Sequence, residues 1–241
     1  MPFLDKLLIK GETQKVVYVD RKVDLAPPKT VLYFPGSLRK DHTIYDLSPY
    51  VNHGTINGAT WVRLPSGLWS LNFDGGDDFI SVANSASLLD FTTVCTFLVW
   101  FYWDDATNGA AIISRDATFS YFLGAYLGTH ATAPRKLTWG KNGSDEILST
   151  IQLSTGQYYC LGVDHNGPTN QIYINGVLDI SVGGKGDFAA RGTAAMLVGK
   201  HTTPAGWWLD GKVALVSAYP TVFSAATHLS FFQQTRHLFG V

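Results

Sequence analysis

The sequence predicts an all-β protein, a large antiparallel sandwich of two sheets, on three observations. Short apolar or alternating runs broken by Gly, Asn and Asp recur from residue 30 onward, which is typical of sandwiches rather than of alternating strands and helices. Asn175-Gly176 separates two β-branched runs, and this dipeptide favours a two-residue hairpin because both residues tolerate positive φ. The run at 93–102 is apolar on both faces, as expected of a central strand covered on each side.

Fourteen segments have the β-branched and aromatic content, and the bounding turn residues, of strands. They are residues 31–34, 58–62, 69–73, 79–82, 93–102, 110–115, 121–127, 136–139, 147–152, 158–164, 171–174, 177–181, 194–198 and 212–218. A short C-terminal helix follows, where Ser224 can cap a segment whose apolar residues recur at near-helical spacing up to Phe239. A chain of 241 residues can hold these elements around one core.

The first 29 residues differ from the rest in charge. Ten of them are charged, about twice the density of the whole chain, and the segment ends at Pro27-Pro28. Its β-branched run at 15–19 predicts a strand or hairpin, so we divide the chain into an N-terminal arm (1–29) and one domain (30–241). Two roles stay open for the arm: it pairs with a neighbouring subunit, or it is an edge hairpin of its own domain.

Composition excludes several classes of partner. The net charge is -1 and no long Lys/Arg run occurs, so nucleic acid is not an expected ligand. No stretch approaches the roughly 18 apolar residues of a membrane span. Asp5 and Lys6 interrupt the short apolar run at the start, which therefore lacks the core of a signal peptide and indicates synthesis in a cytoplasm.

Cys95 and Cys160 are the only cysteines and form no Cys-x-x-Cys motif. Neither a zinc site nor a redox dithiol is indicated. Two interpretations stay open: two free thiols buried in strands, since Cys behaves as a small hydrophobic residue, or one structural disulfide.

Three ordered blocks carry a family resemblance. They are DLSPYVNHGTINGATW at 46–61, LNFDGGDDFISV at 71–82, and a third that runs from GQYY at 156–159 to YING at 173–176, with LVG at 197–199 and LDGKVA at 209–214 closing the pattern. In order and spacing these resemble the laminin G-like branch of the concanavalin-like jelly rolls. The resemblance implies a two-sheet jelly-roll sandwich. It does not select among the family's lectins, adhesion modules, carbohydrate-binding appendages and virus-particle proteins.

Calcium is the one cofactor that the resemblance implies, with Asp46, Asp74 and Asp210 as its ligands, because hard carboxylate oxygens suit this ion. Against it, Ala214 stands where many relatives carry an acidic residue. The alternative is that Asp74-Gly75 and Asp210-Gly211 are turns whose aspartates bond their own backbone.

Catalysis is not expected. Glucanases of this fold cut sugars with two glutamates about 5 Å apart, whereas this chain has only Glu12, in the arm, and Glu146, in a polar turn. Asp77-Asp78 and Asp104-Asp105 are adjacent pairs, and in an extended strand neighbours point to opposite faces. We therefore predict that the protein is not an enzyme.

Trp207-Trp208 is the candidate ligand-binding element, because it lies in a predicted loop after Pro204, where an exposed indole could stack on a sugar or a protein partner. The alternative is that one of the two anchors the core. Polar groups that could complete a sugar site are Asp104, Asp105, Asn108 and His201.

Two functions are consistent with these observations. The first is a structural or adhesive protein on the surface of a virus particle, a bacteriophage capsid-decorating or fibre-associated protein that contacts capsid proteins and itself, as a trimer for example. It is motivated by the fold, the charged arm, the low-charge surface and the lack of a leader or catalytic pair. The second is an extracellular, lectin-like carbohydrate-binding module of a cellular protein.

Overall fold

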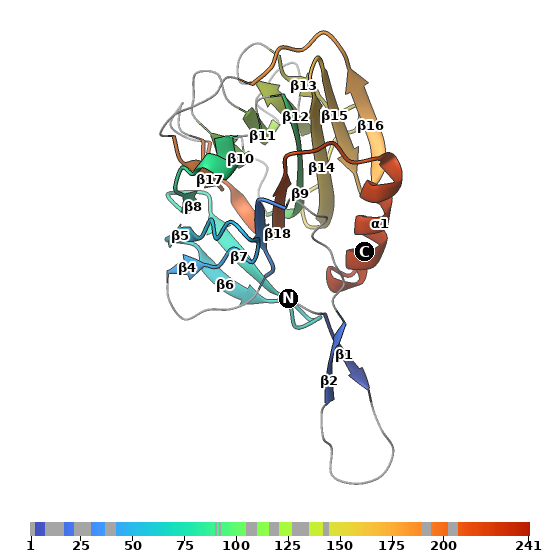
Figure 1. The fold of residues 1–241 in the computed structure, drawn as a ribbon. Coiled ribbons are helices and arrows are strands. Elements are labelled where there is room, and N and C mark those ends of the chain that lie inside the picture. The colour runs from blue at the N-terminus through green and yellow to red at the C-terminus, as the bar shows by residue number, and fades with distance from the viewer. Residues whose placement is uncertain are drawn as a thin grey trace.

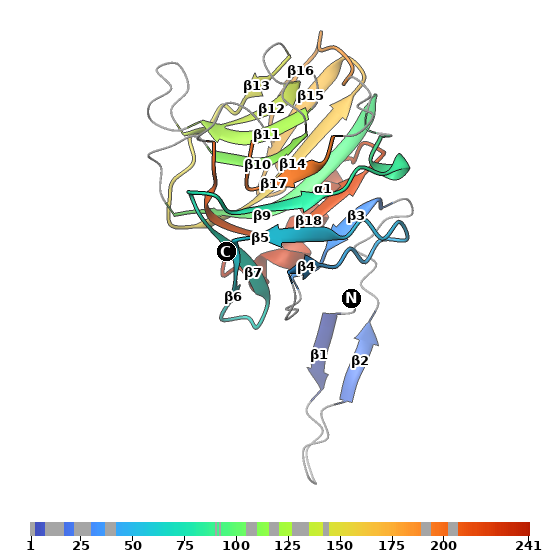
Figure 2. The same cartoon turned by 90° about the vertical axis from the view of Figure 1, so that its left-hand side faces the viewer.

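In a computed structural model, the described residues of the chain form a two-layer antiparallel sandwich with one α-helix on its outside (Figure 1). The structure describes residues 3–7, 17–21, 30–36, 42–89, 91, 93–104, 110–115, 121–126, 135–141, 145–188, 194–201 and 207–241. The view turned by 90° shows the two sheets packed face to face (Figure 2). The predicted fold class is confirmed.

Sheet I contains the longest strands and is entirely antiparallel. Its order is β16 (Val177–Val182), β15 (Thr169–Ile174), β14 (Tyr158–Asn166), β9 (Val94–Trp103), β18 (Asp210–Tyr219), β7 (Trp69–Asp74) and β6 (Thr60–Arg63), and β3 (Leu32–Phe34) also pairs with β18.

Sheet II packs against one face of sheet I. Its order is β13 (Ile147–Leu148), β12 (Lys136–Lys141), β11 (Tyr121–Tyr126), β10 (Ala110–Arg115), β17 (Met196–Val198), β8 (Phe79–Val82), β5 (Gly54–Asn57) and β4 (Thr43–Ile44). The helical segments are η1 (Ala86–Leu89), α1 (Ala225–Thr235) and η2 (Arg236–Leu238).

Each of the fourteen predicted segments overlaps a strand, with boundary shifts of a few residues. The largest difference is β13, which has two residues where six were predicted. Strands β4 and β5 were not predicted. They are short, and the alternating burial of β5 depends on pairing with β8 rather than on strong strand-forming residues.

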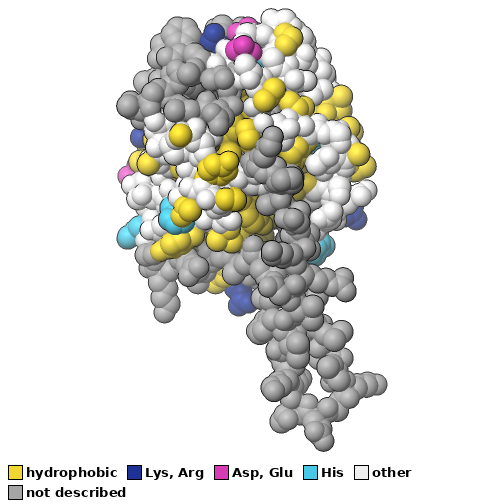
Figure 3. All heavy atoms as spheres, viewed as in Figure 1, with side chains coloured by type: hydrophobic (Ala, Val, Ile, Leu, Met, Phe, Trp, Pro, Cys, Tyr) yellow, Lys and Arg dark blue, Asp and Glu magenta, His cyan; other side chains and the backbone are white. Residues whose placement is uncertain are grey.

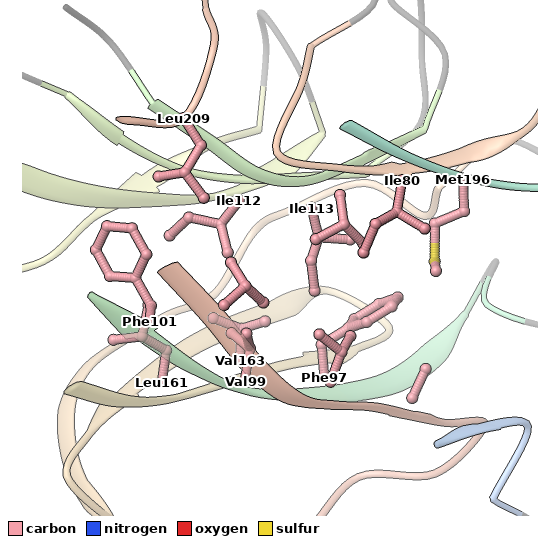
Figure 4. Packing of buried hydrophobic residues seen from close by; sticks show 14 of the residues in the cluster. Ile80, Phe97, Val99, Phe101, Ile112, Ile113, Leu161, Val163, Met196 and Leu209 are labelled. Atoms are coloured by element: carbon pink, nitrogen blue, oxygen red, sulfur yellow. The ribbon is translucent and has the colours of Figure 1, made fainter. Parts of the chain in front are cut away.

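Strand β9 is covered on both faces, as the sequence predicts. Phe97, Val99 and Phe101 point between the sheets, where they meet residues such as Ile112 of sheet II (Figure 4). The alternate residues, represented by Trp100, belong to a second apolar cluster on the outer face of sheet I. Burying these large side chains on both sides makes β9 the centre of the fold.

Helix α1 supplies the cover on the outer face. The Ser224 side chain accepts a hydrogen bond from the Thr227 amide (3.1 Å), which confirms the predicted cap. Trp100 donates its indole N–H to the Thr235 hydroxyl (2.9 Å) and stacks on Phe239, with ring centroids 4.0 Å apart.

A buried polar pair also joins the helix to the sheet. His228 Nε2 lies 3.0 Å from an oxygen of Asp164, and both side chains are essentially inaccessible. The Thr96 hydroxyl donates to the second oxygen of Asp164 (2.6 Å), and the His228 ring stacks on Tyr173. These contacts fix the register of the helix on sheet I, because a buried charge tolerates few alternative partners.

The Asn175-Gly176 hairpin forms as predicted between β15 and β16. Asn175 has φ 52° and Gly176 has φ 77°, the positive pair that a type I′ turn requires. A side chain at Gly176 would press on the backbone of Leu229, so this glycine also allows the hairpin to approach α1 closely.

Both cysteines are free and buried. They lie on paired strands, but Cys95 is opposite His165 whereas Cys160 is opposite Trp100, five residues further along β9. That offset exceeds what a disulfide can span. Burial raises the pKa of both thiols, for Cys95 with help from the charge of Asp164. The free-thiol alternative is confirmed.

The arm contains the antiparallel pair β1 (Phe3–Leu7) and β2 (Val17–Arg21). Figures 1 and 2 both show this hairpin extending away from the sandwich. Within the described residues, no helix combines the length and the apolar character needed to span a membrane.

Candidate functional site

The ends of three neighbouring strands bring aspartates together at one end of the sandwich. Strand β18 lies between β9 and β7. Asp210 at its start is the cross-strand partner of Asp74 at the end of β7. On the other side, the Asp104 amide, just past β9, donates to the Asp210 carbonyl (3.1 Å). Antiparallel pairing therefore gathers residues that are far apart in sequence.

The turn after β7 adds two more carboxylates as the chain crosses from sheet I to sheet II. Oxygens of Asp74, Asp77 and Asp78 all lie within 4.8 Å of one another. Asp78 is buried and accepts the Asp74 amide (3.0 Å). Burial, and then the charges of Asp74 and Asp77, raise the pKa of Asp78, against the effect of this hydrogen bond.

We call Asp74, Asp77, Asp78, Asp104 and Asp210 the acidic rim. The sequence argument that adjacent aspartates point apart holds for extended strands and fails here, because Asp77 and Asp78 lie in a turn. Gly75-Gly76, which directly precede these aspartates, were the sequence signal that could have predicted this turn.

An aromatic clamp borders the rim. The Lys200 ammonium lies 4.4 Å from the ring centre of Phe79 and 4.5 Å from that of Trp208, and the two rings are 6.2 Å apart. Lys200 and Trp208 also form an isolated β-bridge. We call Phe79, Lys200 and Trp208 the clamp. The position of a cation over aromatic faces holds the lysine in place.

Clamp and rim share one set of loops. Phe79 directly follows Asp78, and Trp208 precedes Asp210 by two residues. The Gly75 amide donates to the Leu209 carbonyl (3.0 Å), which ties the β7–β8 turn to the segment that carries Trp208. Sequence reasoning missed Phe79 and Lys200, since neither lies next to the Trp207-Trp208 pair in sequence.

The other residues predicted for ligand binding have distinct surroundings. Trp207 is half-buried and its ring lies 6.3 Å from that of His201, which is itself buried. The Asp104 carboxylate forms an ion pair with Lys212, whose ammonium lies 4.2 Å from the centre of the Tyr102 ring. Asp105 and Asn108 lie outside the described residues.

Asp46, the third residue predicted to bind calcium, lies elsewhere. One oxygen accepts the amides of Tyr33 (2.7 Å) and Ser48 (2.9 Å), and the other accepts the Ser48 hydroxyl (2.6 Å) and the Asn52 amide (2.7 Å). Tyr33 is paired with Ser217, seven residues and roughly 23 Å along β18 from Asp210. Asp46 therefore cannot share an ion with Asp74 and Asp210, and it organises the chain around itself instead.

The remaining carboxylates could hold a cation. Asp74 and Asp77 are exposed, and three oxygens converge within one ion's reach. Convergence on one point suits a cation better than catalysis, in which two carboxylates face each other across a glycosidic bond. Glu146 lies beside β13, where the Thr138 hydroxyl reaches it at 3.4 Å, and Glu12 is outside the described residues.

Two antiparallel sheets packed face to face, with polar and aromatic groups on the loops at one end, define a two-sheet β-sandwich of the jelly-roll class. The chain belongs to the concanavalin A-like lectin/glucanases superfamily, whose sequence model matches residues 74–227. The predicted family is confirmed. A search of curated protein sequences found no match.

Solved structures agree on the fold. Domain 4 of an extracellular GH43 arabinanase from Geobacillus stearothermophilus, solved with arabinotriose, has a TM-score of 0.67 at 13% identity and covers 85% of this chain and 98% of its own. A structure of botulinum neurotoxin type C, whose cell entry depends on two ganglioside molecules, has a TM-score of 0.64 at 14% identity over 86% of this chain. A Trypanosoma rangeli sialidase in complex with sialic acid has a TM-score of 0.66 at 12% identity over 89% of it. This chain spans 51% of the toxin chain and 34% of the sialidase.

The contrast between Asp46 and the rim is testable by stability. We expect Asp46→Ala to lower the free energy of unfolding by roughly 3 kcal/mol or more, because three buried amides lose their acceptor. Asp74→Ala removes only an exposed bond to the Gly76 amide and should change stability by less than about 1 kcal/mol. Urea denaturation of both variants measures the difference, and equal losses would contradict the structural role of Asp46.

Proposed function

We propose that this protein is a non-catalytic carbohydrate-binding module whose ligand lies against the clamp. The observation that carries the proposal is the pairing of Phe79 and Trp208 around Lys200 beside exposed carboxylates. An indole offers an apolar surface for the C–H face of a sugar ring. Carboxylates accept hydrogen bonds from sugar hydroxyls, and a held ammonium donates to their oxygens.

The similar structures support this ligand class. They include an arabinanase domain in complex with arabinotriose, a toxin whose cell entry depends on two ganglioside molecules, and a sialidase in complex with sialic acid. With 12–14% identity they share the fold with this chain, so its own ligand is inferred from the clamp and the rim. Glu12 and Glu146 are too far apart in sequence to lie on one strand, as the paired glutamates of glucanases with this fold do, which favours binding without cleavage.

Trp208→Ala tests the clamp. We expect wild-type protein to bind members of a broad glycan array with millimolar to micromolar affinity and the variant to bind at least about ten-fold more weakly, because it loses the stacking surface. Tyr50→Ala, which removes a 51% exposed aromatic side chain from the Asp46 loop, should bind like wild type. If the wild-type protein binds no glycan on the array, the proposal is wrong.

We also propose that the rim can hold a calcium ion, with Asp74, Asp77 and Asp78 as ligands and Asp210 nearby. An ion there would relieve the repulsion among these carboxylates. A hundred-fold excess of calcium over its Kd would stabilise the fold by about 2.7 kcal/mol, a rise in Tm of several degrees.

Asp77→Asn should remove most of that rise, whereas Asp187→Asn, which alters an exposed aspartate beside His165, should keep it. Melting curves with calcium and with a chelator measure both effects. No shift in wild-type protein, together with no heat on calorimetric titration, would remove calcium from the site.

A second candidate function is that of a particle-borne adhesin, displayed on a virus surface and held there by the arm. The β1–β2 hairpin favours it, since an isolated two-stranded hairpin is marginally stable and gains from pairing with a neighbour. Capsid proteins and further copies of the chain, for example in a trimer, would be its partners. The alternative is an extracellular module of a cellular protein.

Deletion of residues 1–28 separates these two. In the particle-borne case we expect the shortened protein to keep its sandwich, measured by circular dichroism, but to be missing from purified particles or higher oligomers. Unchanged assembly after the deletion would count decisively against an anchoring arm.

A further inference from the structure

We infer that the acidic rim, when it holds no metal ion, makes the clamp selective for neutral glycans and rejects glycans that carry carboxylate or sulfate groups. This inference rests on the proposed glycan-binding function and names the chemical class of its ligand. It depends on the balance of charge around the clamp.

Charge is concentrated at this end of the sandwich. The protein as a whole carries a net charge of -1, and the described residues on the face shown in Figure 3 include few charged side chains. The rim by contrast gathers five aspartates, accompanied by Lys200 and Lys212. Among the described residues of the site, acidic groups therefore exceed basic groups by three, and the approach to the clamp has a negative potential.

Both lysines are already engaged. Lys212 pairs with Asp104 and lies over Tyr102, on the outer face of sheet I. Lys200 lies between the clamp rings. An acidic sugar would be attracted only by these two ammonium groups, one of which already pairs with Asp104, whereas the oxygens of Asp77 accept hydrogen bonds from neutral hydroxyl groups and repel a carboxylate or sulfate.

The charges are near enough to act on a ligand at the clamp. Asp77 precedes Phe79 by two residues and Asp210 follows Trp208 by two residues, so their backbones lie within roughly 7 Å of the clamp residues. That distance is shorter than the Debye length of about 8 Å at physiological ionic strength. At this range and ionic strength each unit charge changes affinity by roughly 1.5-fold in water, so an excess of three predicts discrimination of about three-fold or more.

The test uses matched pairs on one array, each neutral oligosaccharide beside its sialylated or sulfated counterpart, in 0.15 M NaCl with EDTA so that no metal masks the rim. We expect the full-length protein to bind the neutral member at least about three-fold more tightly. The preference should shrink in 1 M NaCl, where the Debye length is about 3 Å. It should also shrink in Asp77→Asn, but not in Asp187→Asn, which lies towards the other end of β9.

Each outcome is informative. Equal or tighter binding of the acidic members, lost in Trp208→Ala, would overturn the selectivity while leaving the glycan-binding function intact. A neutral preference that Asp77→Asn and 1 M NaCl leave unchanged would also overturn it, because the preference would then come from shape. If the wild-type protein binds no member of any pair, the proposed function fails, and the inference that rests on it fails as well.

Discussion

Burial of β9 on both faces is the constraint from which the rest of the architecture follows. Its Phe and Val side chains require sheet II on one side, and Trp100 requires α1 on the other. If only one face of sheet I were covered, the large side chains on the other face of β9 would be exposed to water, at a cost of about 2 kcal/mol for each of them. The C-terminal helix is therefore part of the core, and the buried Asp164–His228 pair fixes its position.

The same central position determines where chemistry can gather. Strands β14 and β18 flank β9, and β7 pairs with the first residues of β18. The start of β18 and the ends of its neighbours β9 and β7 therefore lie at one end of the sandwich. Loops from distant parts of the sequence meet there. The rigid sheets hold Asp74 and Asp210 opposite each other, so a ligand meets a preformed arrangement.

The sequence predicted the elements that depend on local signals. Asn175-Gly176 specified its hairpin through backbone preference alone, and β9 was recognisable by its apolar residues on both faces. Strand β5 was missed because its structure depends on pairing with β8. For the site, Trp208 and the aspartates were found by residue type, but their convergence with Phe79 and Lys200 depends on a crossing between sheets that no local pattern encodes. Asp46 was predicted to bind calcium together with Asp74 because a sequence shows which residues carry a carboxylate, but not which groups donate hydrogen bonds to it.

Asp46 contributes to the stability of the fold, whereas the aspartates of the acidic rim do not. Asp46 is buried, and its oxygens accept four hydrogen bonds from the chain, so its charge stabilises the fold. Asp74, Asp77 and Asp78 crowd together, with few bonds to compensate for their repulsion. Folding alone would favour fewer charges at that position, and local departures from such rules tend to mark functional sites. The rim is therefore better explained by what it binds, or by what it keeps away, than by the stability of the sandwich.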